Sequence, residues 1–297
     1  MKDSIRSVYY QHYKKLFFFP ILLVVIAFII LGINFAQTGD IITKDVSLEG
    51  GTTATIQTDV SFPTLEEDLK VVFPDGDFFV RELNEFGSDT LVGVVIEASG
   101  VEVDELTPVL EEIMGLELNE NNYSVEFIGS SLGESFYKQM LFAILLAFLF
   151  MAIVVFITFR VFVPSFIVVF AAFADMVCTL AILSLFHVRL STAGIAAILL
   201  LIGYSIDTDI LLTTKILKRN EGSVFERLFG AMKTGLTMTA TTVIALTVGY
   251  FVSSSLVLKQ MFLIIVIGLL IDVIMTYAMN AGLLVWYAKT QKRSGSS

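Results

Sequence analysis

Cysteine and histidine, the residues that most often hold metals, are nearly absent from this sequence. Its 297 residues include one cysteine, Cys178, and two histidines, His12 and His187. A single thiol cannot form an intrachain disulfide, and this set supplies no cluster of zinc or haem ligands. Cys178 lies in an apolar run, where a small thiol is typical of helix packing. We therefore expect neither a metal nor a cofactor.

Proline is also scarce, with five residues, whereas hydrophobic residues make up 56% of the chain and the mean hydropathy is +0.82. These values lie well above those of soluble globular domains and indicate a polytopic membrane protein. Six apolar runs are long enough to cross about 30 Å of hydrocarbon as helices. The predicted spans are 16–35, 139–159, 161–186, 192–212, 234–252 and 260–288.

Basic residues are nearly missing from one long segment. Residues 36–135 hold 22 acidic and three basic side chains, which gives a net charge of −19, while the rest of the chain carries +9. Such a split predicts two compartments, an acidic aqueous part and a membrane-embedded part with basic ends.

The remaining basic residues predict the orientation. Thirteen of the 19 lysines and arginines fall in one set of tails and loops, so the positive-inside rule places both termini in the cytoplasm. The first apolar run is longer than a signal-peptide core and no A-x-A cleavage pattern follows it, so we expect a retained anchor. The predicted plan is a cytoplasmic tail at 1–15, a first span at 16–35, an extracytoplasmic domain at 36–138, a membrane bundle at 139–288 and a cytoplasmic tail at 289–297.

The outer segment has the pattern of a small α+β domain. Strand-like and helix-like runs follow one another as strand, helix, strand, strand, helix, strand, with Gly87, Ser88 and Asp89 as turn residues between the two middle strands. This order predicts the split βαβ (βαββαβ) arrangement of a ferredoxin-like domain. The runs are 52–60, 63–73, 77–83, 90–96, 103–116 and 123–128.

Four acidic residues lie inside the predicted spans, namely Asp175, Asp207, Asp209 and Asp272. A charge at such a depth costs roughly 2.5 to 3.5 kcal/mol on insertion scales. No lysine or arginine lies deep in any span, so these acids are protonated, bonded to hydroxyls and backbone, or paired with a second subunit. They form either a ladder for protons or a set of neutral packing residues, and the sequence leaves both open.

Asp207 and Asp209 are about 200° apart around a helix, so they cannot face the same partner. Asp209 is close to the predicted inner border, where it would reach headgroups or Lys233. We therefore expect Asp207 to have the interior role.

The fifth predicted span is rich in threonine. Thr234, Thr237 and Thr241 share one helical face. They indicate a polar interior of the bundle, although a threonine hydroxyl also bonds to its own helix backbone. Small residues such as Gly203 in the fourth span are typical of close helix packing.

Two motifs carry a resemblance to a known family. Leu48-Glu-Gly-Gly-Thr52 follows the first span, and the fourth span contains Ile202-Gly-Tyr-Ser-Ile-Asp-Thr-Asp209. With the βαββαβ order and five later spans, the sequence resembles the archaeal form of the SecF family of protein-export membrane proteins, in the RND-like superfamily. The motif residues are Gly50, Gly51, Thr52, Gly203, Tyr204 and Ser205.

The resemblance implies a role and partners. Members pair with SecD, form half of an RND-type bundle and assist the Sec translocon in moving unfolded secretory proteins across the plasma membrane. Bacterial relatives are thought to use the proton-motive force through polar residues of the fourth span. Their pattern is closer to Ile-Asn-Asp-Thr, so the acid is displaced by one position here. Lys233 stands roughly where those relatives carry an arginine, which suggests a pair with Asp207 or Asp209.

Two other functions remain open. A half-subunit of an RND-type small-molecule exporter would need a second half of the same kind, and an assembly subunit would stabilise the translocon without energy coupling. An enzyme is not expected, because no grouping of nucleophile, base and oxyanion donors is present. The expected partners are SecD, the translocon, an unfolded chain and the lipid bilayer, with no nucleic acid.

Overall fold

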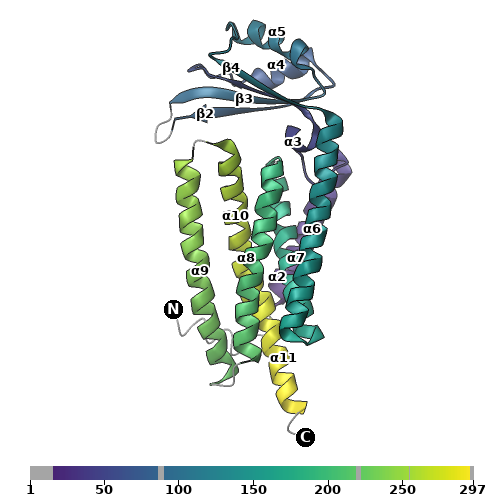
Figure 1. Cartoon of the computed structure of the whole chain (residues 1–297), viewed down its shortest axis with the longest axis vertical. Coiled ribbons are helices and arrows are strands. Elements are labelled where there is room, and N and C mark those ends of the chain that lie inside the picture. Colours follow the sequence, from purple (N-terminus) through teal and green to yellow (C-terminus); the bar gives the residue numbers. More distant parts are fainter. Residues whose placement is uncertain (1–15, 86–89, 219–221, 254, 295–297) are drawn as a thin grey trace.

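The computed structural model describes residues 16–85, 90–218, 222–253 and 255–294. The predicted tail at 1–15 and the turn residues Gly87, Ser88 and Asp89 lie outside them. Figure 1 shows a helical bundle with a small α+β domain at one end, and the sheet of that domain lies between its own two helices and the bundle.

Within the described residues, six helices are long and apolar enough to cross a membrane, as the sequence predicts. The last of them is interrupted by a π-helical segment, η1, which the hydropathy pattern does not reveal. The spans are α2 (Phe18–Thr38), α6 (Ser130–Phe159), α7 (Phe162–Leu185), α8 (Thr192–Leu217), α9 (Val224–Val252) and α10 (Leu256–Ile274), which continues through η1 (Met275–Asn280) into α11 (Ala281–Ser294).

Three helices, α6, α9 and α10, begin earlier than the predicted spans, and polar turns extend the apolar runs of α6 and α9 by about a further nine or ten residues. Helix α9 starts at Val224 instead of 234, and Ser223 and Glu226 form a capping box that satisfies its first amides. Helix α6 starts at Ser130, directly after the last strand of the outer domain. The domain is therefore joined to α6 without a flexible linker.

The outer domain contains one antiparallel sheet with strand order β2-β3-β1-β4. Two helices cover one face, and the core between them contains Ile56, Phe78, Ile96, Leu69 and Leu106. Its elements are α3 (Val46–Glu49), β1 (Gly51–Ile56), α4 (Leu65–Val72), β2 (Asp77–Asn84), β3 (Leu91–Ser99), α5 (Val103–Met114) and β4 (Tyr123–Ile128).

The Gly50-Gly51 motif packs backbone against backbone at the junction of domain and bundle. A Cβ on Gly50 would lie 2.5 Å from the Cα of Ser130, and one on Gly133 would lie 2.6 Å from the amide nitrogen of Gly50. Gly50 and Gly51 also have φ values of 91° and 146°, which favour glycine. Thr52 is buried and donates to the carbonyl of Val101. The motif thus fixes the outer domain to the start of α6.

Candidate functional site

Three of the four predicted membrane acids meet in the centre of the bundle. Asp175 on α7, Asp209 on α8 and Asp272 on α10 are each at most 1% exposed. The Ser205 hydroxyl donates to Asp175 Oδ2 at 2.6 Å, and the carboxyl groups of Asp175 and Asp272 lie close enough to interact. The three helices therefore share one polar centre inside an apolar bundle.

A threonine and an asparagine from η1 complete this centre. Thr276 Oγ1 lies 3.0 Å from Asp209 Oδ1 and 3.1 Å from Asp272 Oδ1. The Asn280 amide donates to Asp209 Oδ1 at 2.5 Å. Asp272, Thr276 and Asn280 are spaced by four residues, so one side of the α10–η1 segment presents all three to α8. The group of Asp175, Ser205, Asp209, Asp272, Thr276 and Asn280 is called the acid centre below.

The hydrogen bonds around Thr276 bear on the protonation of the acid centre. The Thr276 hydroxyl has one hydrogen but lies within hydrogen-bond distance of two carboxyl oxygens. That hydrogen forms one full bond or is shared between the two oxygens, and a proton on either carboxyl would supply a second full bond. This arrangement therefore favours a proton on Asp209 or Asp272.

The acid centre has no counter-ion among the described residues, because none of their ion pairs includes Asp175, Asp209 or Asp272. One oxygen of each of these aspartates is buried without a hydrogen-bond partner, and so is Asn280 Oδ1. A buried carboxylate without a cation is strongly destabilising, whereas a protonated carboxyl donates to a neighbouring oxygen. The arrangement can thus bind and release protons at a position shielded from lipid.

The expected roles of Asp207 and Asp209 are reversed in the structure. Asp207 is exposed on the surface of the bundle, whereas Asp209 is fully buried. The buried face of α8 runs through Ser205, Asp209 and Leu212 and packs against α7 and α10. Because Asp207 lies on the other side of the helix, it cannot join that face.

The suggested ion pair of Lys233 with Asp207 or Asp209 is not formed. Lys233 is exposed on α9, and none of the ion pairs of the described chain involves it. The Thr237 and Thr241 hydroxyls are exposed and donate to carbonyls of their own helix, that of Thr237 to Lys233 and that of Thr241 to Thr237. The threonine face of α9 therefore points away from the acid centre.

Gly203 and Tyr204 have different surroundings. The Tyr204 hydroxyl lies 2.9 Å from that of Thr242 and links α8 to α9. Gly203 is exposed, and a Cβ added there would meet no atom within 4 Å. The close packing expected at this glycine is therefore not provided by this chain.

Thr276 and Asn280 were not among the candidates taken from the sequence. The signal for them is a polar residue four and eight positions after Asp272 in an otherwise apolar run. Periodicity at this spacing marks one helix face, and it would have placed both residues beside Asp272.

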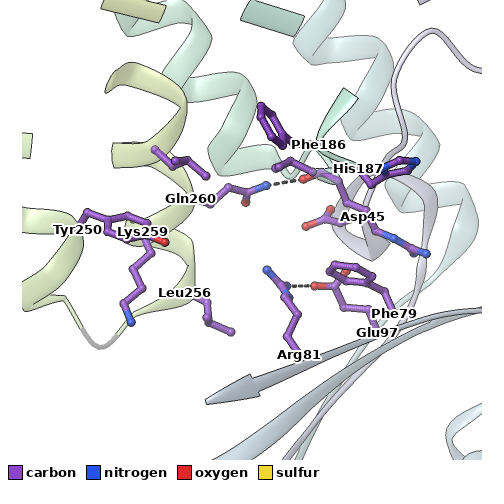
Figure 2. A pocket seen from close by; sticks show the side chains of 13 residues that line it. Asp45, Phe79, Arg81, Glu97, Phe186, His187, Tyr250, Leu256, Lys259 and Gln260 are labelled. Atoms are coloured by element: carbon purple, nitrogen blue, oxygen red, sulfur yellow. Dashed lines mark hydrogen bonds and ion pairs between the residues drawn. The ribbon is translucent and has the colours of Figure 1, made fainter. Parts of the chain in front are cut away.

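A second polar site lies outside the membrane part, where the sheet faces the bundle. It is a cavity of about 270 Å³. Figure 2 shows Phe79, Arg81 and Glu97 extending from the sheet, with Tyr250, Leu256, Lys259 and Gln260 on the side of α9 and α10.

The loop between α7 and α8 joins this cavity to three parts of the chain. Arg189 pairs with Asp77 at 2.8 Å and donates to the carbonyl of Phe78 on β2. The Gln260 amide of α10 donates to the carbonyl of Arg189. The amide of Asp45 donates to the carbonyl of Leu190 at 3.0 Å. The loop therefore ties the outer domain to the bundle.

The pKa values of two carboxyl groups in this cavity, those of Asp45 and Glu97, are raised. Burial raises the pKa of Asp45 above its usual value, although hydrogen bonds from Ser47 and the charge of Arg81 oppose the rise. Burial also raises the pKa of Glu97, whose ion pair with Arg81 opposes it. Both groups bind a proton more readily in the folded chain than in an unfolded one.

The Asp45→Asn variant should change how stability depends on pH. A raised carboxyl pKa favours the folded state as the pH falls toward the ordinary value of 3.8, and this contribution is lost as the pH rises through the raised pKa. Asparagine cannot ionise but still accepts from the Ser47 amide. In heat-unfolding series on the purified chain, the variant should match or exceed the parent at about pH 8 and lose that advantage toward about pH 4. A difference that stays constant with pH would contradict this expectation.

Comparisons with known proteins agree over nearly the whole chain. Residues 109–290 match the family described as protein export membrane protein SecD/SecF, C-terminal. The chain is 36% identical over 279 residues to the protein-export membrane protein SecF of Methanolacinia petrolearia, which covers 93% of this chain and 94% of that protein. It is also 36% identical over 297 residues to SecF of Pyrococcus furiosus, and that match covers 99% of this chain and 97% of the relative.

Among solved structures, the chain is similar to the translocon-associated membrane protein SecDF from Thermus. The TM-score is 0.71 at 19% sequence identity, and the match covers 93% of this chain and 38% of SecDF. The two proteins share a fold over that part, and this chain spans 38% of the length of SecDF.

Proposed function

The chain belongs to the SecF family of protein-export membrane proteins, and from that premise we propose that it acts with SecD as a non-enzymatic accessory subunit of Sec-dependent protein translocation. The match to SecF proteins over almost the full length of both chains supports this proposal. In the proposed arrangement, the ferredoxin-like domain at 36–138 lies outside the cell and both termini lie in the cytoplasm. The basic tails and loops support that orientation. The translocon and an unfolded secretory chain are the further partners.

SecD covers the open face of α8 and α9 in this proposal. Asp207 and Gly203 are exposed on α8, and Thr237 and Thr241 are exposed on α9. A charged side chain in a membrane span is costly against acyl chains and normally faces protein or water. A small residue with no neighbour, such as Gly203, allows a second helix to approach closely.

The Gly203→Leu variant tests both the interface and the function. A leucine on this face would overpack a helix–helix contact at a typical cost of about 1 to 3 kcal/mol. We expect roughly tenfold less SecD to co-purify with the full chain, together with a slower secretion rate. Gly32→Leu on α2 is the matched control, because Gly32 is also exposed and has no atom near its Cβ position.

Equal recovery of SecD with both variants would place the interface elsewhere. Normal secretion with a new sensitivity to small toxic molecules would instead favour the exporter function. The readouts are the amount of bound SecD, secretion of a reporter, and growth in the presence of such molecules.

We further propose that export is coupled to proton movement through the acid centre. The observation that carries this proposal is the position of the single Thr276 hydroxyl between two buried carboxyl groups. Release of the shared proton would leave two carboxylates competing for one donor. That competition favours a different packing of α8 against α10. Protonation thereby selects between two arrangements of the bundle.

A further inference from the structure

The two edges of the outer sheet differ in their protection. At the β2 edge, Arg189 pairs with Asp77 and donates to the carbonyl of Phe78, so a charged side chain protects the start of the strand. At the β4 edge, no further strand pairs with Tyr123–Ile128 in the part of the chain that the structure describes. An uncovered edge strand offers a template for another chain, and proteins normally protect such edges.

The register of β4 shows which of its backbone groups are available. The amide of Gln57 donates to the carbonyl of Asn122, so this pair is hydrogen-bonded across the ladder. Pairs alternate between bonded and non-bonded in an antiparallel ladder. Ser124 and Glu126 therefore bond to β1, while Val125 and Phe127 direct their amide and carbonyl groups to the open edge.

The side chains of this edge are apolar and acidic. Val125 and Phe127 are 38% and 61% exposed, and Glu126 between them is also exposed. The segment that contains the domain carries 22 acidic and three basic residues. A partner that matches this surface is extended, apolar at alternate positions and basic overall.

We propose that the β4 edge binds the translocating polypeptide by strand addition, with Val125 and Phe127 supplying both backbone hydrogen bonds and apolar contacts. This inference rests on the proposed export function, because an unfolded chain emerging on this side of the membrane is extended and has its backbone groups free. Main-chain bonding gives affinity without strict sequence requirements, which suits many different clients.

A photo-cross-linking experiment tests the site directly. A photoreactive residue replaces Phe127 in the full chain, assembled with SecD in spheroplasts that hold a secretory protein arrested during translocation. The matched control position is Val71, which is 79% exposed on α4, the helix that packs against β2. We expect the arrested chain to be cross-linked at Phe127 and roughly tenfold less at Val71. Cross-links from Phe127 to SecD, or equal yields at the two positions, would overturn the inference.

A backbone variant separates strand addition from mere proximity. Val125→Pro removes the outward amide of residue 125 without removing a bond to β1, whereas Val125→Thr keeps it. With the photoreactive residue at position 127, we expect the cross-link yield to fall roughly tenfold in the proline variant and to stay unchanged in the threonine variant. Equal yields in the two variants would exclude backbone pairing.

Folding and the broader function are monitored in the same cells. Resistance of the outer domain to protease confirms that each variant is folded. Dependence of secretion on the presence of the chain tests the export function separately. Secretion that depends on the chain, without a preferred cross-link at β4, would overturn the inference and leave the proposed function standing.

Discussion

Asp209→Asn is expected to lower chain-dependent protein export at least about tenfold while the complex with SecD still assembles. Asparagine has nearly the same shape as aspartate, and its Oδ1 still accepts from Asn280 or Thr276. It cannot bind or release a proton. A proton-coupled mechanism is therefore lost, whereas a purely structural role would be largely retained.

The readout that distinguishes these roles is the response to a protonophore. In the parent, collapse of the proton gradient should lower the secretion rate to that of the Asp209→Asn variant, and the variant should not respond further. Asp207→Asn is the comparison variant on the same helix, because Asp207 is exposed and lies on the side of α8 away from the acid centre. The amount of bound SecD is measured beside its secretion rate, because this side is the proposed SecD interface. Normal export by Asp209→Asn at normal levels of the complex would exclude proton coupling through this residue.

Gly50→Ala is expected to destabilise the junction of the outer domain by about 2 to 6 kcal/mol. Gly50 has φ 91° and ψ 151°, a region that is nearly restricted to glycine and costs other residues about 1 to 3 kcal/mol. The added methyl would also lie 2.5 Å from the Cα of Ser130, where the neighbour is backbone and cannot rotate away. Overpacking of this kind adds about 1 to 3 kcal/mol.

Gly115→Ala separates the two causes. Gly115 ends α5 at φ 64° and ψ 27°, the left-handed helical region, which costs other residues about 1 to 2 kcal/mol. A Cβ there would meet no atom within 4 Å, so this variant carries a backbone cost and no overpacking. Limited proteolysis and heat-unfolding of the purified chain should show a small shift for Gly115→Ala and release or loss of the outer domain for Gly50→Ala. Similar shifts in proteolysis and heat-unfolding for the two variants would mean that the contact of Gly50 with α6 contributes little to the stability of the junction.

The sequence was sufficient to predict the six spans and the order of elements in the outer domain. Long apolar runs and clear alternation are strong signals, and both depend only on neighbours along the chain. The ends of the helices were less well predicted. The Ser223–Glu226 capping box extends α9 beyond its apolar part, and a hydropathy window does not detect such a cap.

The acid centre could be predicted only in part. Helical geometry shows that Asp207 and Asp209 point in opposite directions, but it does not show which direction is inward. That depends on the packing of α8 against α7 and α10, which brings together residues nearly 100 positions apart. The estimated depth along the helix suggested that Asp207 has the interior role. In the structure, Thr276 and Asn280 on η1 form hydrogen bonds with Asp209 instead.

The close packing of Gly50 against Ser130 and Gly133 makes α6 a rigid connection between the outer domain and the far end of the bundle. Its 30 residues form a rod of about 45 Å that is clamped to the outer domain at Gly133. At the other end, the Lys218 ammonium, at the end of α8, bonds to the carbonyl of Thr158 at 2.7 Å. Helix α6 therefore connects the outer domain to the end of the helix that carries Asp209. In the proposed mechanism, load on the outer domain and proton occupancy of the acid centre thus act on the same third of α8, the part that contains Asp209 and ends at Lys218.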